Sequence, residues 1–206
     1  MLPLMRAAFL PLLALPALAF ASPGEADERG HRCRFEGWVE SADPAALEVR
    51  TAPSPGAALV GRLPPPEMDE EYAFGTEFRV VEARGGWFRI EDAYRWSQGR
   101  EMPSTLPEGW IPGSALDFAL QTDKAFEAPD PRSRVVATSW QAADGAHTFT
   151  YRLPSDCRGE WVRLLVTGRD GREQPAWVRG VCGIQTTTCD GMQGDHIPPD
   201  DLPVLD

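Results

Sequence analysis

A set of short sequence blocks that occurs twice in the same order constrains the fold of this chain more than any other feature. The first copy contains Ala52-Pro53-Ser54-Pro55, Leu59-Val60-Gly61, Gly86-Trp87-Phe88-Arg89-Ile90 and Trp110-Ile111-Pro112-Gly113. The second copy contains Ala128-Pro129-Asp130-Pro131, Val135-Val136-Ala137, Glu160-Trp161-Val162-Arg163-Leu164 and Trp177-Val178-Arg179-Gly180. Four blocks recurring in one order predict an internally duplicated unit, and a duplicated small module is typical of a binding or positioning device.

Within each copy the apolar residues follow the pattern of short β-strands. Residues 47–50, 77–82 and 87–90 of the first copy alternate or cluster apolar and polar side chains over strand lengths, with β-branched and aromatic residues enriched. Arg84-Gly85-Gly86 has the composition of a hairpin turn. In the second copy we expect strands at residues 148–153 and 161–166, with a corner at Pro154-Ser155-Asp156. No window has a capped helical stripe, so we expect little helix.

The first residues predict an export signal. Arg6 ends a short basic start, residues 7–18 are almost wholly apolar, and Ala19-Phe20-Ala21 offers small residues at the two cleavage-recognition positions. We expect cleavage before Ser22 and an exported protein, periplasmic or extracellular, without membrane insertion. The net charge of −11 disfavours nucleic-acid and anionic-membrane partners, because both bind through Lys and Arg.

Four cysteines in an exported chain favour two disulfides. The preferred pairing joins Cys157 to Cys182 within the second copy and Cys33 to Cys189 across the ends. A Cys182–Cys189 bridge, which closes a short local loop, is the alternative. No Cys-x-x-Cys pair is present and the histidines are poorly placed to complete a zinc site, so we expect neither a metal nor another cofactor.

Several blocks of the first copy together resemble the bacterial SH3-like (SH3b) domain. They are Leu47-x-Val49-Arg50-x-Ala52-Pro53-Ser54, Leu59-Val60-Gly61, Gly75 before a strand, Gly86-Trp87-Phe88 and Gly109-Trp110-Ile111. Glu48 stands where the family usually has Asn. The second copy keeps Ala128-Pro129, Trp161-Val162 and Trp177-Val178 but loses the Leu-x-Val-Arg opening. The resemblance implies small antiparallel barrels of five to six strands, found on exported bacterial proteins and cell-wall hydrolases, where many position a partner on peptidoglycan or bind peptide.

The resulting prediction is an all-β chain with two tandem SH3-like small antiparallel barrels after a cleaved signal peptide. We assign residues 1–21 to the signal peptide, 22–34 to a tether, 35–118 to the first domain, 119–190 to a second, diverged domain, and 191–206 to a disordered acidic tail.

Candidate ligand-binding residues lie in segments that the two copies do not share. Tyr94 and Trp96 fall in a polar loop, residues 91–108, that is longer in the first copy, and loops tend to carry function. Glu70 and Glu71 belong to an acidic segment after Pro64-Pro65-Pro66, where signalling-type SH3 domains place acids that meet a basic residue beside a proline helix. The repeat-equivalent Trp87, Trp110, Trp161 and Trp177 are instead expected to pack in the cores.

One segment resembles a catalytic motif. Ser155-Asp156-Cys157-Arg158-Gly159 is similar to the nucleophile segment of the NlpC/P60 cell-wall peptidases. A catalytic thiolate there needs a helix start and a nearby His base, whereas Cys157 leads into an expected strand. We therefore expect an exported, non-catalytic binding module for a cell-wall glycan or peptide or for an envelope protein. The alternative is a structural adaptor or inhibitor, acting as a rigid, disulfide-stapled spacer.

Overall fold

A computed structural model describes residues 30–39, 41, 43–44, 47–69, 72–97, 100–102, 106–138, 150–168 and 171–183. These residues form antiparallel sheets, and their single helical element is the 3-10 turn η1 (Gly113–Ala115). The all-β class predicted from the sequence is therefore confirmed. The described part of the chain contains no helix long and apolar enough to cross a membrane. The expected signal peptide and acidic tail lie outside the described residues.

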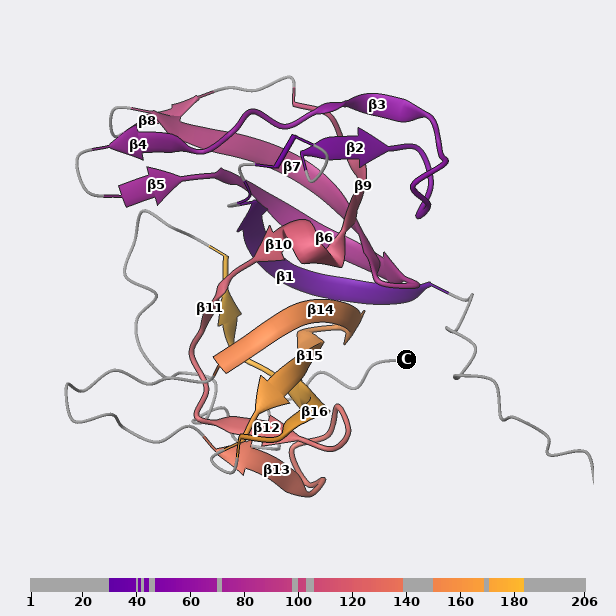
Figure 1. Cartoon of the computed structure of the whole chain (residues 1–206), viewed down its shortest axis with the longest axis vertical. Helices are drawn as coiled ribbons and strands as arrows, with labels where there is room; N and C mark the ends of the chain where they lie inside the picture. The colour runs from indigo at the N-terminus through magenta and orange to yellow at the C-terminus, as the bar shows by residue number, and fades with distance from the viewer. Residues whose placement is uncertain are drawn as a thin grey trace, which may run out of the picture.

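The first sheet has eight strands in the order β10-β1-β6-β7-β9-β2-β3, with β8 paired to β7 (Figure 1, upper part). Its strands are β1 (His31–Val39), β2 (Glu48–Arg50), β3 (Leu59–Arg62), β6 (Thr76–Arg84), β7 (Trp87–Ser97), β8 (Arg100–Met102), β9 (Gly109–Pro112) and β10 (Leu116–Asp117). A separate hairpin joins β4 (Glu67–Asp69) to β5 (Tyr72–Phe74).

The second sheet has five strands in the order β13-β12-β16-β15-β14 (Figure 1, lower part). They are β12 (Lys124–Phe126), β13 (Val135–Thr138), β14 (Thr150–Arg158), β15 (Trp161–Thr167) and β16 (Glu173–Val178). A two-stranded ladder joins β11 (Ala119–Leu120) to β17 (Val181–Cys182). We call strands β2, β3, β6, β7 and β9 the first module. Strands β12 to β16 form the second module.

The two modules share one connectivity. When the five strands of each module are numbered along the chain, their order across the sheet is third, fourth, fifth, first, second. This order is β6-β7-β9-β2-β3 in the first module and β14-β15-β16-β12-β13 in the second. The bulge between Val49 and Arg50 recurs between Ala125 and Phe126. The repeated strand order supports the internal duplication predicted from the sequence.

The turn between the first two strands of each module repeats bond for bond. Thr51 N–H donates to Ala58 O at 2.9 Å, and Glu127 N–H donates to Arg134 O at the same distance. Inside the turn, the N–H of Ser54 and that of Asp130 each donate to the carbonyl two residues earlier, both at 2.8 Å. The Ala-Pro-x-Pro blocks that revealed the repeat therefore encode one backbone turn used twice.

The predicted tether, residues 22–34, extends too far, because strand β1 (His31–Val39) already begins at His31. Alternate side chains Cys33, Phe35 and Val39 are buried, while Arg32, Arg34 and Glu36 are exposed. The charged alternate positions conceal the period-two apolar pattern of a strand with one solvent-facing side. β1 extends the first sheet by pairing with β6.

The same strand joins the first sheet to the second module. Arg34 N–H donates to Gly159 O at 2.7 Å and Gly159 N–H donates to Arg32 O at 2.8 Å, which makes a short parallel bridge to the end of β14. A disulfide links Cys33 to Cys157 at this point. Figure 1 shows β1 lying directly above β14.

This disulfide shows that the preferred cysteine pairing was wrong. Cys157 bonds to Cys33 and not to Cys182, so Cys33 does not bond to Cys189 either. Pairing within a repeat was favoured because nothing in the sequence placed Cys33 beside the second module. Cys182 is also disulfide-bonded. Cys189 lies outside the described residues, so the alternative Cys182–Cys189 pairing stays a prediction.

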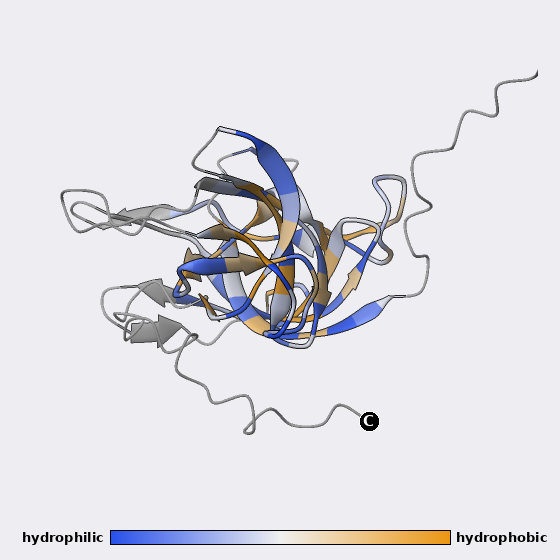
Figure 2. Cartoon of the chain, turned by 90° about the horizontal axis from the view of Figure 1, so that it is seen from below, coloured by the Kyte–Doolittle hydropathy of each residue, from blue (hydrophilic) through white to orange (hydrophobic). Residues whose placement is uncertain are grey.

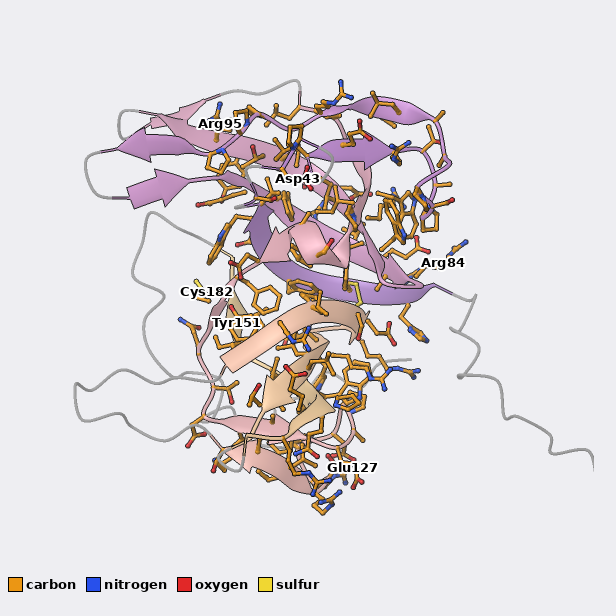
Figure 3. The ribbon with its side chains drawn as sticks, in the orientation of Figure 1. Asp43, Arg84, Arg95, Glu127, Tyr151 and Cys182 are labelled. Atoms are coloured by element: carbon orange, nitrogen blue, oxygen red, sulfur yellow. A yellow bond between two sulfur atoms is a disulfide. The ribbon has the colours of Figure 1, made fainter. Side chains whose placement is uncertain are left out.

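A continuous hydrophobic core crosses the junction between the modules. The Phe35 and Phe118 rings meet edge to face at 5.9 Å, and Phe118 stacks on Tyr151 of β14 at 5.5 Å. The Tyr151 hydroxyl donates to the Phe118 carbonyl. Figure 3 shows Tyr151 on the face of the second module that meets the first, and Figure 2 shows apolar residues concentrated along the inner strands.

Two further expectations about local structure are corrected. The corner expected at Pro154-Ser155-Asp156 is a register irregularity inside β14, next to Leu153 with its positive φ of 53°. The expected loop at residues 91–108 is largely a hairpin, because β7 continues to Ser97 and pairs with β8. Alternating aromatic side chains at positions 94 and 96 favour the extended conformation.

Candidate ligand-binding cleft

Tyr94, one of the predicted ligand-binding residues, takes part in packing within the first sheet. It lies on β7 opposite Glu77 of β6 and is half-buried. Its hydroxyl donates to Glu77 Oε2 at 2.5 Å, and Glu77 is 1% exposed. The Tyr94 hydroxyl therefore pairs with a buried carboxyl group. The sequence does not reveal this contact because it predicts a loop at residues 91–108, whereas β7 continues to Ser97.

The structure does not describe the side chains of the other predicted site residues. The backbone of Trp96 pairs with Glu101 in the β7–β8 hairpin, and its side chain lies outside the described part of the structure. Glu70 and Glu71 also lie outside the described residues. A ligand site formed by Tyr94, Trp96, Glu70 and Glu71 therefore stays a prediction.

The repeat-equivalent tryptophans are mainly structural, as expected. Trp110, Trp161 and Trp177 are between 7% and 8% exposed. Trp87, the counterpart of Trp161, is half-buried. The difference follows from a neighbour: Phe126 meets the Trp161 ring edge to face at 5.4 Å, and the repeat-equivalent residue in the first module is Arg50.

A cleft of about 430 Å³ lies at the tip of the second module, where the β12–β13 turn meets the β14–β15 turn and β1. Its apolar lining consists of Pro129 and Pro131 from the first turn and Trp161 from the start of β15. Prolines and an indole present flat, rigid surfaces that lose little entropy when they pack against a ligand. The lining is therefore suited to an apolar group or an extended peptide.

Four arginines and two acidic residues complete the cleft. The acids are Asp130 and Glu160, and the arginines are Arg34, Arg132, Arg158 and Arg179. Glu160 is shared by two guanidiniums, with Arg34 Nη2 at 2.7 Å from Oε1 and Arg179 Nε at 3.6 Å from Oε2. One carboxylate cannot neutralise both. A protein of net charge −11 thus carries a locally basic cleft.

Asp130 and Arg132 neutralise each other at one edge of this cleft. Asp130 Oδ1 accepts from the Arg132 backbone N–H at 2.8 Å and from its Nε at 3.2 Å. These hydrogen bonds, the backbone one first, lower the pKa of Asp130 below its ordinary value. Asp130 is consequently ionised at neutral pH, and the excess positive charge belongs to the remaining arginines.

Arg158 makes no ion pair with any described residue. Its Nη2 donates to His31 Nε2 at 3.2 Å, and His31 Nδ1 lies 2.8 Å from Asp156 Oδ1. Arg158 is thus held in place by a ring nitrogen, and no described carboxylate pairs with its charge.

A second cleft, of about 530 Å³, lies in the first sheet beside Cys33. Its charges are balanced, with Arg32 and Arg89 against Glu82 and Glu91. The Arg89 guanidinium already lies 2.5 Å from Glu91 and 3.9 Å from Glu82. This cleft therefore offers less free charge to a ligand than the cleft of the second module.

The repeat contains the signal that could have revealed the basic cleft. Gly56, Gly86 and Pro112 in the first copy correspond to Arg132, Glu160 and Arg179 in the second. Charged residues therefore replace small or rigid ones at three matching positions. Arg34 could not be found in this way, because it comes from β1, which has no counterpart in the second module.

Cys157, the residue of the peptidase-like segment, is fully buried in its disulfide and lies in a strand. It therefore has neither the thiolate nor the helix start that a cysteine nucleophile needs. Within the described residues, no group of three or more His, Cys, Asp or Glu side chains is arranged to hold a metal ion.

Comparison with known proteins identifies no relative. No protein-family model matches the chain, and no curated protein or solved structure matches it significantly.

Proposed function

We propose that this chain is an exported, non-catalytic binding protein made of two SH3-like modules, which recognises a cell-envelope ligand or an envelope protein. The observation that carries the proposal is the cleft in the second module, where prolines, Trp161 and arginines in charge excess line one concave surface. Ligand sites commonly combine an apolar lining with a few well-placed polar groups.

Two observations support the export and module parts of the proposal. The Cys33–Cys157 disulfide is typical of oxidising compartments, which agrees with the signal-like first residues. The shared five-strand connectivity agrees with the resemblance of the sequence blocks to SH3b domains. Among candidate ligands we favour the peptide part of peptidoglycan, because the cleft suits an extended peptide with negative charge.

A sedimentation assay with purified peptidoglycan tests this function. The mature protein, residues 22–206, should co-sediment with peptidoglycan that has been stripped of protein and should remain in solution without it. Trp96→Ala tests the rival surface on the β7–β8 hairpin. If the parent protein stays in solution with peptidoglycan while it captures one envelope protein, the peptidoglycan ligand is wrong. If Trp96→Ala no longer sediments with peptidoglycan, the binding site lies on the β7–β8 hairpin.

A rigid spacer or adaptor is the second candidate. The favouring observation is the joint made by β1, which pairs with β6, bridges to Gly159 and carries the disulfide to Cys157. Such a joint holds two modules at a fixed distance. A spacer needs no cleft, so substitutions at the cleft arginines should leave its activity unchanged.

A further inference from the structure

The charges of the second-module cleft restrict the chemistry of its ligand. Glu160 lies between Arg34 and Arg179, and Arg158 has only the His31 ring as a partner among the described residues. Arg179 is the most enclosed of the four, with its side chain 10% exposed, and its only partner among the described residues is Glu160 at 3.6 Å. A guanidinium removed from water without a close partner is unfavourable, so an anion that reaches it is bound strongly.

The shape of the arginine side chain favours a carboxylate. A guanidinium presents parallel N–H groups that match the two oxygens of a carboxylate. Phosphate has the same match, but a phosphate group by itself would not use the apolar lining. A carboxylate attached to a peptide satisfies both the arginines and the Pro129, Pro131 and Trp161 surfaces.

We propose that the second-module cleft binds an acidic peptide, with Arg158 and Arg179 holding a carboxylate and with Trp161 and the two prolines contacting an adjacent apolar side chain. This inference rests on the proposed binding function and specifies its ligand class. Arg34 and Glu160 act as positioning residues, because their ion pair at 2.7 Å fixes the wall of the cleft next to Arg179. The first module lacks this site, because Gly86 and Pro112 replace Glu160 and Arg179.

Calorimetric titration with two matched peptides tests the ligand class. The first is acetyl-Ala-Glu-Leu-Pro-Glu-amide, and the second has Gln in place of both Glu residues. Titration into residues 22–206 at low salt should show binding of the acidic peptide and at least about tenfold weaker binding of its Gln analogue, because each charge-assisted bond lost costs about one such factor. Equal binding of the two peptides overturns the proposal.

Arginine variants locate the site. Arg158→Gln should weaken binding of the acidic peptide about tenfold. Arg84→Gln is the matched control, since Arg84 occupies the repeat-equivalent position at the end of β6 (Figure 3) and should leave binding unchanged. Arg179→Lys keeps the charge of the enclosed residue but removes its planar fork, so it should weaken binding while circular dichroism reports an unchanged fold. Equal losses in Arg84→Gln and Arg158→Gln contradict the proposed location.

Two further measurements separate this inference from the proposed function. Inorganic phosphate that abolishes peptide binding at equimolar concentration overturns the proposal in favour of a simple anion site. If the acidic peptide binds through Arg158 but peptidoglycan does not retain the protein, the ligand class stands and the peptidoglycan ligand fails. If peptidoglycan retains Arg158→Gln as well as the parent, the proposed function stands and the carboxylate site fails.

Discussion

The two modules share a backbone but differ in the chemistry at their tips. In the first, Gly85 and Gly86 both have positive φ, and Gly86 accepts from Gly113 N–H at 2.8 Å, which closes the tip with backbone groups. In the second, Glu160 replaces Gly86 and gathers Arg34 and Arg179. Strand order and turn bonds are the same in both modules, so the residues that differ between the copies are the ones on which the proposed binding to the second module depends.

The interiors differ in a related way. Phe126 stands opposite Trp177 as Arg50 stands opposite Trp110. The phenyl ring forms a small aromatic cluster with Trp161 and Trp177, whereas Arg50 makes an ion pair with Glu48. Trp161 belongs both to this aromatic cluster and to the lining of the basic cleft.

The largest predicted effect concerns the joint between the modules. Replacing Cys33 and Cys157 together with Ser should lower the free energy of unfolding by about 4–5 kcal/mol, because the bridge closes a loop of 124 residues. Chemical denaturation measures the loss. The control replaces Cys182 and Cys189 with Ser. A Cys182–Cys189 bridge, which the sequence offers as the alternative pairing, closes a much shorter loop, so its loss should cost less. Equal losses in the two double variants would contradict the role of the long-range bridge.

The tryptophan counterparts sharpen the comparison of the two cores. Trp161→Ala should cost about 3–5 kcal/mol because it removes a buried ring from the aromatic cluster. Trp87→Ala should cost less, since Trp87 is only half-buried. Thermal unfolding of both variants measures the difference, and a larger loss for Trp87→Ala would refute the packing described for the second module.

A glycine at the junction tests how closely the modules are fitted. A Cβ at Gly113 would lie 2.1 Å from the Pro154 carbonyl oxygen of β14, so Gly113→Ala should cost about 1–3 kcal/mol through overpacking. Gly56→Ala is the control, because its Cβ would meet nothing nearer than 3.9 Å. Unchanged stability in Gly113→Ala would mean that the junction is looser than the structure indicates.

Lowering the pH should have the smallest effect on stability, and this effect should involve both modules. Hydrogen bonds from Arg62 and Arg134 lower the pKa of Glu48 and Glu127, respectively, below the ordinary value of 4.5. Carboxylates with a lowered folded-state pKa stabilise the protein above the unfolded-state value, and this contribution is lost as the pH falls through the folded-state value. The melting temperature should therefore be level near neutrality and fall below about pH 4.5. In Arg134→Gln the melting temperature should fall less steeply below about pH 4.5. If its dependence on pH is identical to that of the parent, the Glu127–Arg134 pair does not contribute.

The sequence was enough to predict the β-class, the hairpin turn at Arg84-Gly85-Gly86 and the burial of Trp110, Trp161 and Trp177. Gly85 and Gly86 act locally, so their turn conformation can be predicted from neighbouring residues. The junction could not be predicted in the same way. β1 alternates charged with apolar residues, and its partners in β14 lie more than a hundred residues away, as the Cys33–Cys157 separation of 124 shows.

The residues of the candidate sites also differ in how far the sequence alone could predict them. The sequence predicts Tyr94 as a loop aromatic, but the structure places it in strand β7 beside buried Glu77 of β6. Three of the charged positions in the basic cleft could be found by comparing the copies, whereas Arg34 and the His31 contact with Arg158 depend on β1. A site assembled across the junction requires the three-dimensional structure.

The central claim is that binding belongs to the second module alone, on a backbone that both modules share. Backbone amide chemical shifts of the mature protein, recorded during titration with soluble peptidoglycan fragments, test it most directly. The account predicts shifts at residues 129–132 and 158–161 and none at the equivalent residues 53–56 and 84–87. Shifts of equal size at both sets, or shifts confined to residues 91–97 of the first-module hairpin, would contradict it.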